Sequence, residues 1–496
     1  MGERNMKLRA IATETAVIVV LLLTAVFVGS RTMHVDVGYG DDWPMNTFKA
    51  FRYAPSVMMA LGRGFVDPVS EPVPGLDAFL RQDEKRLDLK APASTIQARE
   101  PLSVSKGHLY LFGSVAAVWA HCGISWVVFK QIIVAVFVVT TLIAYGVFRL
   151  GMSRWISAVC TAVFVFSPMV AAVLPDLRDF AKAPFVLAVV AILGYLLVRP
   201  RKLSVLLAAA VVLGALQGIG RGFRTDLLLC VPASTLVLLA VPRGEARRQV
   251  VPRVAAVLLM LASYFAATYP LRRATTGLGS MASHHGLEGL ATQSRATLGM
   301  GRASYEASYL KHDMLTFATL STYGRRVLGM DEPIAFHTPA AAQAADACLR
   351  EYLTTFPADF IARAYAAVLY LLRGPPGALL VLAGLLVISA YGVGRALLLL
   401  ALVLYFLGVT SIEFEPRHAF HLTFVPVWFA GFLIQCMGKR LTARRDIFPM
   451  GARLAGRRML VFAAISTALM ILPLAAARAY QARTVGKLVD RCARAE

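Results

Sequence analysis

The sequence predicts an all-α membrane protein that crosses the bilayer about 11–13 times. Three observations lead to this fold class: 57% of the 496 residues are hydrophobic, only 16% are charged, and the mean hydropathy is +0.63. Soluble globular chains average about 45–50% apolar and about 25% charged residues. This balance excludes a soluble enzyme, a disordered chain and a secreted disulfide-rich scaffold.

Apolar stretches long enough to cross a bilayer recur along the chain. Eleven are assigned as spans: 11–30, 128–148, 155–174, 184–199, 203–220, 227–242, 254–270, 377–394, 396–412, 419–437 and 459–475. Arg4, Lys7 and Arg9 precede the first span, so the positive-inside rule predicts a cytoplasmic N-terminus. No clear small-residue cleavage site follows this span, which is therefore interpreted as an uncleaved anchor.

Residues 107–126 are apolar as well, but they are expected to form a re-entrant or interfacial helix that does not cross the membrane. A crossing there would place Arg149 and Arg154 outside and would invert every later loop, against the positive-inside rule. Without it, the basic segments between spans all become cytoplasmic: 149–154, 199–202, 243–253 and 439–458. The net charge of +22 therefore reports topology, and no nucleic-acid partner is expected.

This topology leaves two large periplasmic loops and predicts three parts of the chain. Residues 1–270 form an N-terminal transmembrane module that includes the first loop, 31–106. Residues 271–376 form the second loop with interfacial helices, and residues 377–496 form the C-terminal helices with an outer tail. No internal repeat is found, which argues against an inverted-repeat transporter.

Three carboxylates lie just beyond the first span, where the chain leaves the membrane: Asp36, Asp41 and Asp42. A carboxylate at the membrane surface can act as a general base toward an acceptor hydroxyl or amine. Partial burial would raise its pKa toward a useful value. A solvated, turn-forming loop is the alternative interpretation.

A second group of charges lies between two apolar spans, at Asp176, Arg178, Asp179 and Lys182. Charges at the bilayer edge are costly, and they usually mark a function. One interpretation is a site that orients a charged substrate and could also hold a divalent cation. The other is a self-neutralising network of ion pairs that contributes little.

Two further basic groups occur at span ends. Arg221 and Arg224 begin an outer turn, where guanidinium forks suit a phosphate or carboxylate, although they could equally cap a helix. Pro416 places Arg417 at the head of a late span, at headgroup depth. A permanently charged, bidentate donor fits an anionic lipid headgroup, and His418 could add a contact. An interfacial anchor that reaches toward water is the alternative.

The second loop contains the histidines His284, His285 and His312, the last of them followed by Asp313. Their spacing matches no metal-binding motif, so no cofactor is assigned to them. Loop histidines of this kind are expected to be solvated.

The order of these features resembles the GT-C superfamily of polytopic glycosyltransferases, especially bacterial relatives of the protein mannosyltransferases and the aminoarabinose transferases of lipid A. The acidic motif and large loop are followed by Gly107-His108-Leu109-Tyr110, which is similar to the family's His-Pro-Pro-Leu-Tyr element without its prolines. Phe166-Ser167-Pro168 precedes the second charged turn, and Pro416-Arg417-His418 with Pro426 is similar to the family's late Arg-Tyr…Pro pattern.

The resemblance implies a GT-C-like bundle that transfers a sugar from a polyprenyl-phosphate carrier to a lipid, glycan or protein acceptor at the periplasmic face. One acid of the first loop would be the base, with Asp41 or Asp42 preferred to Asp36, and Arg417 would hold the lipid phosphate. Arg178, Lys182, Arg221 and Arg224 would stabilise negative charge, and His108, Asp179 and His418 would also bind the substrate. The resemblance also implies a bacterial inner membrane as the location. A membrane ligase or polymerase of lipid-linked glycans is the alternative. A lipid or solute transporter is disfavoured because the charges gather at span ends.

Overall fold

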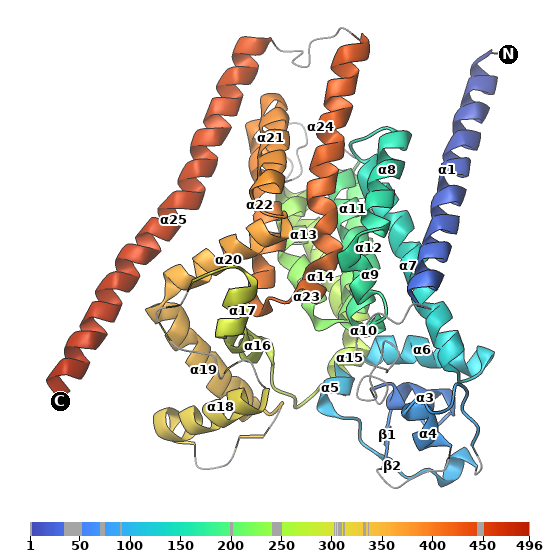
Figure 1. The fold of residues 1–496 in the computed structure, drawn as a ribbon, viewed down its shortest axis with the longest axis vertical. Coiled ribbons are helices and arrows are strands. Elements are labelled where there is room, and N and C mark those ends of the chain that lie inside the picture. The colour runs from blue at the N-terminus through green and yellow to red at the C-terminus, as the bar shows by residue number, and fades with distance from the viewer. Residues whose placement is uncertain are drawn as a thin grey trace. The chain divides into compact units, whose positions relative to one another are not determined.

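A computed structural model describes most of the chain (Figure 1). The described residues are 2–33, 52–69, 75–89, 92–198, 202–240, 250–301, 303, 305, 310, 313–330, 334–335, 337–443 and 451–495. They form two compact units, Met1–Thr276 and Gly277–Glu496, and each unit is described by itself. Helices dominate both units. The strands of the described part are β1 (Asp67–Pro68) and β2 (Ala98–Arg99), which pair antiparallel.

The described residues contain eight helices that are long and apolar enough to cross a membrane. They are Leu8–Thr32, Trp126–Arg149, Leu177–Val198, Leu203–Arg221, Val250–Ala267, Val393–Glu413, Pro416–Leu441 and Ala452–Arg494. A ninth crossing arises if Pro357–Leu371 and Pro375–Tyr391, bent by 91°, count as one span. This confirms the predicted all-α polytopic fold.

Three of the eleven predicted spans are not among these eight helices. The span at 377–394 corresponds to α21 (Pro375–Tyr391), the second half of the bent pair. The span at 155–174 is interrupted at Pro168, so that α8 (Arg154–Val165) is followed by the separate helix α9 (Pro168–Val173). The span at 227–242 is an apolar helix over Thr225–Ala240. A proline has no backbone N–H to continue a helix, which explains the break at Pro168.

The first helices of the N-terminal unit fit the predicted topology. Helix α1 (Gly2–Thr32) packs against α7 (Trp126–Arg149) and α8. Arg149 Nε lies 3.0 Å from Glu14 Oε1, and Arg154 Nη1 donates to the Ala10 carbonyl at 3.0 Å. The start of α1 and the basic turn 149–154 therefore lie at the same end. Helix α6 (Leu109–Cys122), at about 1.5 Å per residue, is too short to cross a hydrocarbon core of about 30 Å, as predicted for 107–126.

Aromatic side chains attach the first large loop to α7. The Phe79 and Trp126 rings stack with centroids 4.8 Å apart, and Trp126 Nε1 donates to the Phe79 carbonyl at 2.9 Å. Tyr53 meets Phe129 edge-on at 4.6 Å. The loop also contains the helices α3 (Ala54–Ala60), α4 (Leu76–Leu80), η1 (Ala93–Thr95) and α5 (Ser103–Lys106). This packing places residues 52–53 beside the bundle.

The remaining helices of the first unit are α10 (Leu177–Phe180), α11 (Lys182–Val198), α12 (Leu203–Arg221), η2 (Thr225–Leu229), α13 (Cys230–Ala240), α14 (Val250–Ala267) and α15 (Tyr269–Ala274). Helices α12 and α14 approach closely because two glycines face α14. A Cβ on Gly214 would overlap the Met260 carbonyl oxygen, and a Cβ on Gly218 would lie 2.7 Å from Ala267 Cβ. Small residues four apart are what close packing of membrane helices requires.

The second unit begins with α16 (Ala282–Glu288), α17 (Thr292–Thr297), α18 (Asp313–Leu328) and α19 (Pro339–Thr355). It continues with α20 (Pro357–Leu371), α21 (Pro375–Tyr391), α22 (Val393–Gly408), η5 (Val409–Glu413), α23 (Pro416–Ala419), η6 (Phe420–Thr423) and α24 (Phe424–Ala443). Buried apolar residues of α16, α18 and α19 form one core, which includes Leu287, Leu320 and Ala344.

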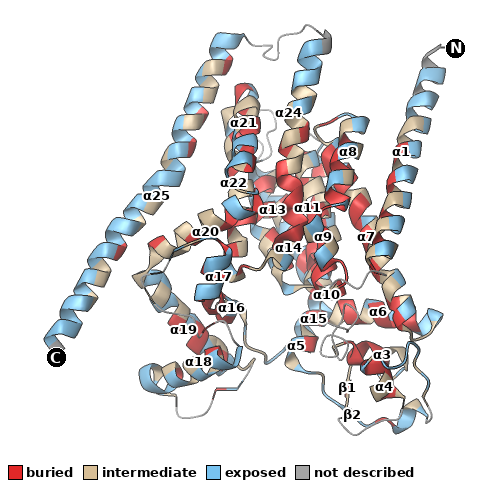
Figure 2. Cartoon of the chain, in the orientation of Figure 1, coloured by how far each residue is buried: buried red, intermediate tan, exposed pale blue. Residues whose placement is uncertain are grey.

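The chain ends in α25 (Ala452–Ala495), a helix of 44 residues that is mostly exposed (Figure 2). At about 1.5 Å per residue it extends well beyond a hydrocarbon core of about 30 Å. Gln481 attaches it to the start of α20, because its Oε1 accepts from Ala358 N at 3.0 Å and its Nε2 donates to Asp359 Oδ2 at 3.1 Å. Tyr365 Oη of α20 donates to the Met470 carbonyl at 2.8 Å.

Candidate functional site

The charged turn before α11 is held in place by its own local structure. Asp176 caps the short helix α10, since its side chain accepts from Asp179 N at 3.4 Å. Leu177 and Phe180 are buried on either side of the two charged residues of this helix. The apolar residues therefore anchor the turn, and they leave Arg178 and Asp179 fixed at the end of a span.

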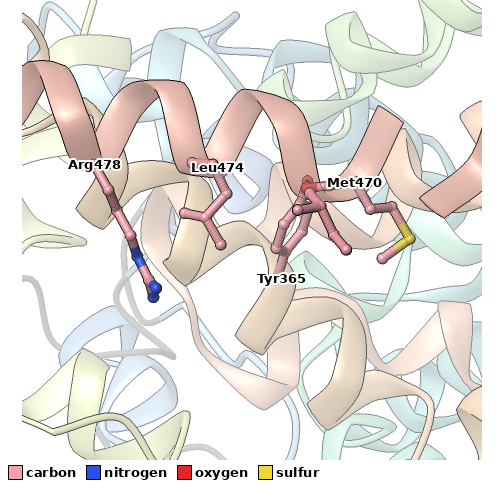
Figure 3. Close-up of a pocket in the computed structure, with 6 residues that line it drawn as sticks. Tyr365, Met470, Leu474 and Arg478 are labelled. Carbon is pink, nitrogen blue, oxygen red and sulfur yellow. The ribbon is translucent and has the colours of Figure 1, made fainter. Parts of the chain in front are cut away.

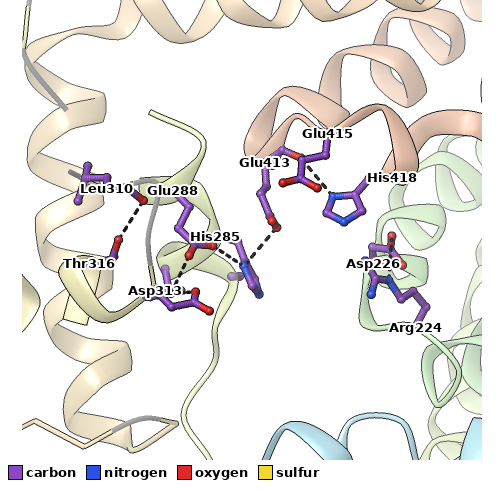
Figure 4. A network of polar contacts seen from close by, with 12 residues as sticks. Arg224, Asp226, His285, Glu288, Leu310, Asp313, Thr316, Glu413, Glu415 and His418 are labelled. Carbon is purple, nitrogen blue, oxygen red and sulfur yellow. Dashed lines mark hydrogen bonds and ion pairs between the residues drawn. The ribbon is translucent and has the colours of Figure 1, made fainter. Parts of the chain in front are cut away.

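Five predicted site residues meet here, within the first unit: His108, Arg178, Asp179, Lys182 and Arg224. Asp179 is fully buried, with Arg224 Nη1 2.8 Å and Arg178 Nη2 3.8 Å from its Oδ1. Lys182 is 1% exposed and donates to Asp226 Oδ2 at 2.7 Å. Arg224 Nε lies 3.9 Å from the same oxygen of Asp226, and Figure 4 labels these two residues. We call these five residues, together with Asp226, Asp176, Arg52 and Tyr53, the basic cluster.

His108 is fixed against the loop that carries Arg224. Its Nδ1 lies 2.8 Å from the Phe223 carbonyl, so Nδ1 must donate the proton. Tyr110 N donates to the Gly222 carbonyl at 3.1 Å, and a side chain on Gly222 would overlap the Tyr110 ring. Burial lowers the pKa of His108 to about 3, with the positive charge of Arg224 adding to the effect. His108 is therefore neutral at physiological pH, and its Nε2 carries a lone pair.

Arg52 and Tyr53 also belong to the basic cluster, and the sequence did not indicate them. Burial lowers the pKa of Arg52 to about 10, and the neighbouring charge of Arg178 acts in the same direction. Burial also raises the pKa of the Tyr53 hydroxyl well above its ordinary value. Arg52 comes close through the aromatic packing of the first loop, which no local charge pattern reveals.

The basic cluster has a positive net charge. Its described members are four basic residues and three acidic ones: Arg52, Arg178, Lys182 and Arg224, with Asp176, Asp179 and Asp226. The net charge is +1, because His108 is neutral. The Nε of Arg178 has no hydrogen-bond partner in the described part of the chain. A buried guanidinium with a free donor is suited to an anion such as a phosphate.

The remaining predicted site residues have other contacts, belong to the second unit or fall outside the described residues. Arg221 Nη1 donates to the Tyr264 hydroxyl at 2.9 Å. In the second unit, Arg417 pairs with Glu415 and its side chain is 43% exposed, while His418 Nδ1 lies 3.5 Å from the Glu413 carbonyl oxygen. Asp36, Asp41 and Asp42 fall outside the described residues.

A second polar group, which we call the histidine–carboxylate cluster, lies in the second unit (Figure 4). His284 Nε2 is 3.3 Å from both Glu288 Oε1 and Asp313 Oδ1. His285 Nδ1 is 3.1 Å from Glu288 Oε2 and 3.2 Å from Glu413 Oε2. The expectation that these histidines are solvated is wrong for His284, which is 1% exposed because α16 packs it under α18.

The histidine–carboxylate cluster also has unusual electrostatics. Burial by itself would lower the pKa of His284, but hydrogen bonds to Asp313 and Glu288 outweigh burial and raise the pKa to about 9. The hydrogen bond with His284 holds the pKa of Asp313 below its usual range, and a hydrogen bond with Glu288 acts in the same direction. Two sets of side chains in this cluster contain ligands that suit a divalent cation. They are His284, Glu288 and Asp313, and His285, Glu288 and Glu413. The sequence placed such a site at Asp176 and Asp179 instead, where arginines already neutralise the fully buried Asp179.

A largely apolar groove of about 540 Å³ lies between α20 and α25 (Figure 3). It is lined by Tyr365, Met470, Ile471, Leu474, Ala475 and Arg478. One basic side chain beside an apolar surface is the arrangement that takes a lipid chain with an anionic headgroup.

No family model matches the chain, and no curated protein matches it. Three solved structures of the oligosaccharyltransferase of Archaeoglobus fulgidus are similar over 94% of this chain, each at 11% identity. One is tethered to an acceptor peptide with an NVT sequon by a disulfide bond, one is AglB with an inhibitory peptide and a dolichol-phosphate, and one is the apo form. Their TM-scores are 0.45, 0.48 and 0.45.

The present chain spans about half of their length, 55–56% of each matched chain.

Proposed function

We propose that the protein is a membrane glycosyltransferase that takes a sugar from a polyprenyl-phosphate carrier and transfers it to a lipid, glycan or protein acceptor. The proposed location is the periplasmic face of a bacterial inner membrane, with the N-terminus in the cytoplasm. The single observation that carries the proposal is the basic cluster, a set of buried and partly buried charges, most of them at span ends, with a net charge of +1.

The basic cluster suits the leaving group of such a reaction. When the acceptor oxygen forms its bond to the anomeric carbon, the bond from that carbon to the phosphate oxygen breaks and its electron pair stays on the phosphate. Arg178, with its unpartnered Nε, would stabilise this charge, supported by Arg224 and Lys182. Arg221 of the same unit, and Arg417 and His418 of the second unit, are separate candidates for a phosphate contact.

The acceptor must also lose a proton to a base. We assign this role to Asp41 or Asp42, with Asp36 as the third candidate, because a carboxylate at the membrane surface can take a proton from a hydroxyl. His108 can serve as a hydrogen-bond acceptor through Nε2, since Nδ1 donates to the Phe223 carbonyl. Membrane lipids are the other proposed partners, at surfaces such as the groove beside α25.

The first experiment measures binding of a polyprenyl monophosphate to the purified full-length protein in nanodiscs. We expect Arg178→Ala to weaken binding at least tenfold, because a charge-assisted hydrogen bond to phosphate is lost. Arg325→Ala, which removes an exposed arginine of α18, is the matched control and should bind like the wild type. Equal binding of wild type and Arg178→Ala, or of polyprenol and polyprenyl phosphate, would contradict the proposal.

Transfer itself is tested with the lipid that co-purifies with the protein, identified by mass spectrometry. Arg417→Ala should abolish transfer in a protein that still folds and inserts. Asp41→Asn and Asp42→Asn should be compared separately, and wild-type turnover in both would move the base elsewhere. A ligase of lipid-linked glycans would instead consume a diphosphate-linked oligosaccharide. A transporter would move lipid across the bilayer of proteoliposomes without forming a new glycosidic bond.

A further inference from the structure

Helix α16 and η5 bring a histidine and two glutamates together, although more than a hundred residues lie between these two elements in the sequence. His285 and Glu288 lie three residues apart on α16, and Glu413 ends η5. His285 Nδ1 is 3.1 Å from Glu288 Oε2 and 3.2 Å from Glu413 Oε2. The three ligand atoms all lie within 4.8 Å of one another.

These separations are those of ligands around one metal ion. Zn²⁺ binds histidine nitrogen and carboxylate oxygen at about 2.0–2.2 Å. Two such ligands at tetrahedral or octahedral angles are then about 2.8–3.6 Å apart. The measured 3.1 and 3.2 Å fall within this interval.

The charges of the histidine–carboxylate cluster also call for a cation. Among the described residues, no lysine or arginine forms an ion pair with Glu288 or Asp313, and histidines are their only basic partners. Glu288 is 9% exposed, and the carboxylates of Glu288, Asp313 and Glu413 share two histidines, so the cluster remains acidic even with His284 protonated. The basic cluster shows the contrast, because its carboxylates face arginine and lysine side chains.

The backbone fixes this arrangement. Gly289 follows Glu288 directly, and a Cβ at this position would overlap the Ile412 carbonyl oxygen, next to Glu413. The two chain segments can therefore approach only because residue 289 has no side chain. Arg363 of α20 donates to the Gly289 carbonyl and holds the end of α16 from the other side.

We propose that His285 Nδ1, Glu288 Oε2 and Glu413 Oε2 bind one divalent cation. His284 supports the site from outside, because its Nε2 lies 3.3 Å from the other oxygen of Glu288 and from Asp313. A carboxylate ligand that is itself hydrogen-bonded in this way is oriented toward its metal. Three protein ligands leave further coordination positions for water or a phosphate oxygen.

The donor set indicates the kind of cation. Imidazole nitrogen favours transition metals, whereas Mg²⁺ and Ca²⁺ prefer sites made of oxygen alone. Two carboxylates and one imidazole suit Mn²⁺ and Zn²⁺. The bound cation would join α16 to η5, and so fix the segment that leads into α23.

The test measures Mn²⁺ binding to the EDTA-treated, full-length protein in detergent, by the loss of the free-ion signal in electron paramagnetic resonance. We expect one Mn²⁺ per chain, competition by Zn²⁺, and weak competition by Mg²⁺. Glu413→Gln and His285→Gln should each weaken binding at least a hundredfold. Asp313→Asn should weaken it about tenfold, as expected for an outer partner of a ligand.

Glu351→Gln is the matched control, since it removes an exposed carboxylate of the same unit that accepts from the Tyr323 hydroxyl. It should bind Mn²⁺ like the wild type. Each variant is first compared with the wild type by size exclusion and thermal unfolding, and the two ligand variants give independent tests if one misfolds. Wild-type affinity in folded Glu413→Gln, or a larger loss in Asp313→Asn than in Glu413→Gln, would overturn the assignment. The measurement needs no donor, so it stands or falls apart from the proposed transfer reaction.

Discussion

Asp179→Asn is expected to destabilise the protein strongly, because this carboxylate neutralises two guanidinium groups in a buried place. Asp179 is fully buried, with Arg224 at 2.8 Å and Arg178 at 3.8 Å. At an effective dielectric constant of about 20, these separations correspond to attractions of about 6 and about 4 kcal/mol before desolvation. Removing one partner of a buried pair typically costs about 3–5 kcal/mol, since the remaining charge is left uncompensated. We expect a loss in that range.

Arg224→Met, which removes the basic partner, should lower the free energy of unfolding less than Asp179→Asn does. In Arg224→Met, Asp179 keeps Arg178 nearby, whereas Asp179→Asn leaves two cations facing each other. The double variant should be more stable than the sum of the two single losses predicts, by about 1–3 kcal/mol.

The assay is unfolding of the purified protein in mixed micelles by titration with a denaturing detergent, followed by circular dichroism. Asp490→Asn, at an exposed position of α25, is the control and should lie within about 0.5 kcal/mol of the wild type. A loss below about 1 kcal/mol for Asp179→Asn, or additive losses in the double variant, would refute the reasoning.

Three further predictions concern packing and pH. Gly214→Ala should lower the free energy of unfolding by about 1–3 kcal/mol, because the new Cβ would overlap the Met260 carbonyl oxygen. A Cβ at residue 146 would meet no atom within 4 Å, so the control Gly146→Ala should be neutral or stabilising. Folding lowers the pKa of His108 from 6.5 to about 3, so protonation below pH 6.5 favours the unfolded state. The free energy of unfolding of the wild type should therefore fall by about 1.4 kcal/mol per pH unit relative to His108→Gln. Thermal unfolding of both proteins at several pH values measures this difference. Gly289→Ala should separate α16 from η5 and lower the affinity for Mn²⁺, although it removes no ligand. Unchanged Mn²⁺ affinity in that variant would mean that the close approach is not needed.

Much of the fold follows from the sequence because hydrophobic length and the positions of arginines report directly on membrane crossing. The contact of Arg154 with the start of α1 agrees with the predicted topology, and so does the short α6. The break at Pro168 was visible in the sequence, but hydropathy alone joined the two pieces into one span.

The candidate site was only partly predictable. Arg178, Asp179 and Lys182 are neighbours in sequence, so their charge pattern marks them locally. Arg52 arrives through the packing of Tyr53 on Phe129, a contact between distant segments that no local pattern encodes.

The sequence contains a local signal for the histidine–carboxylate cluster. His284 and His285 precede Glu288 by four and three residues, and both spacings place side chains on the same face of a helix. The third partner, Glu413, could not be found in this way, because its approach depends on the missing side chain of Gly289.

The two attachments of α25 to α20 have a mechanical consequence. Met470 and Gln481 are eleven residues apart on one continuous helix, which separates the attachments by about 16 Å along its axis. Two attachments at this separation fix the orientation of α20 relative to α25 as well as its position. A chain that ended before Gln481 would keep the contact of Tyr365 with Met470, and α20 could then pivot about that single point.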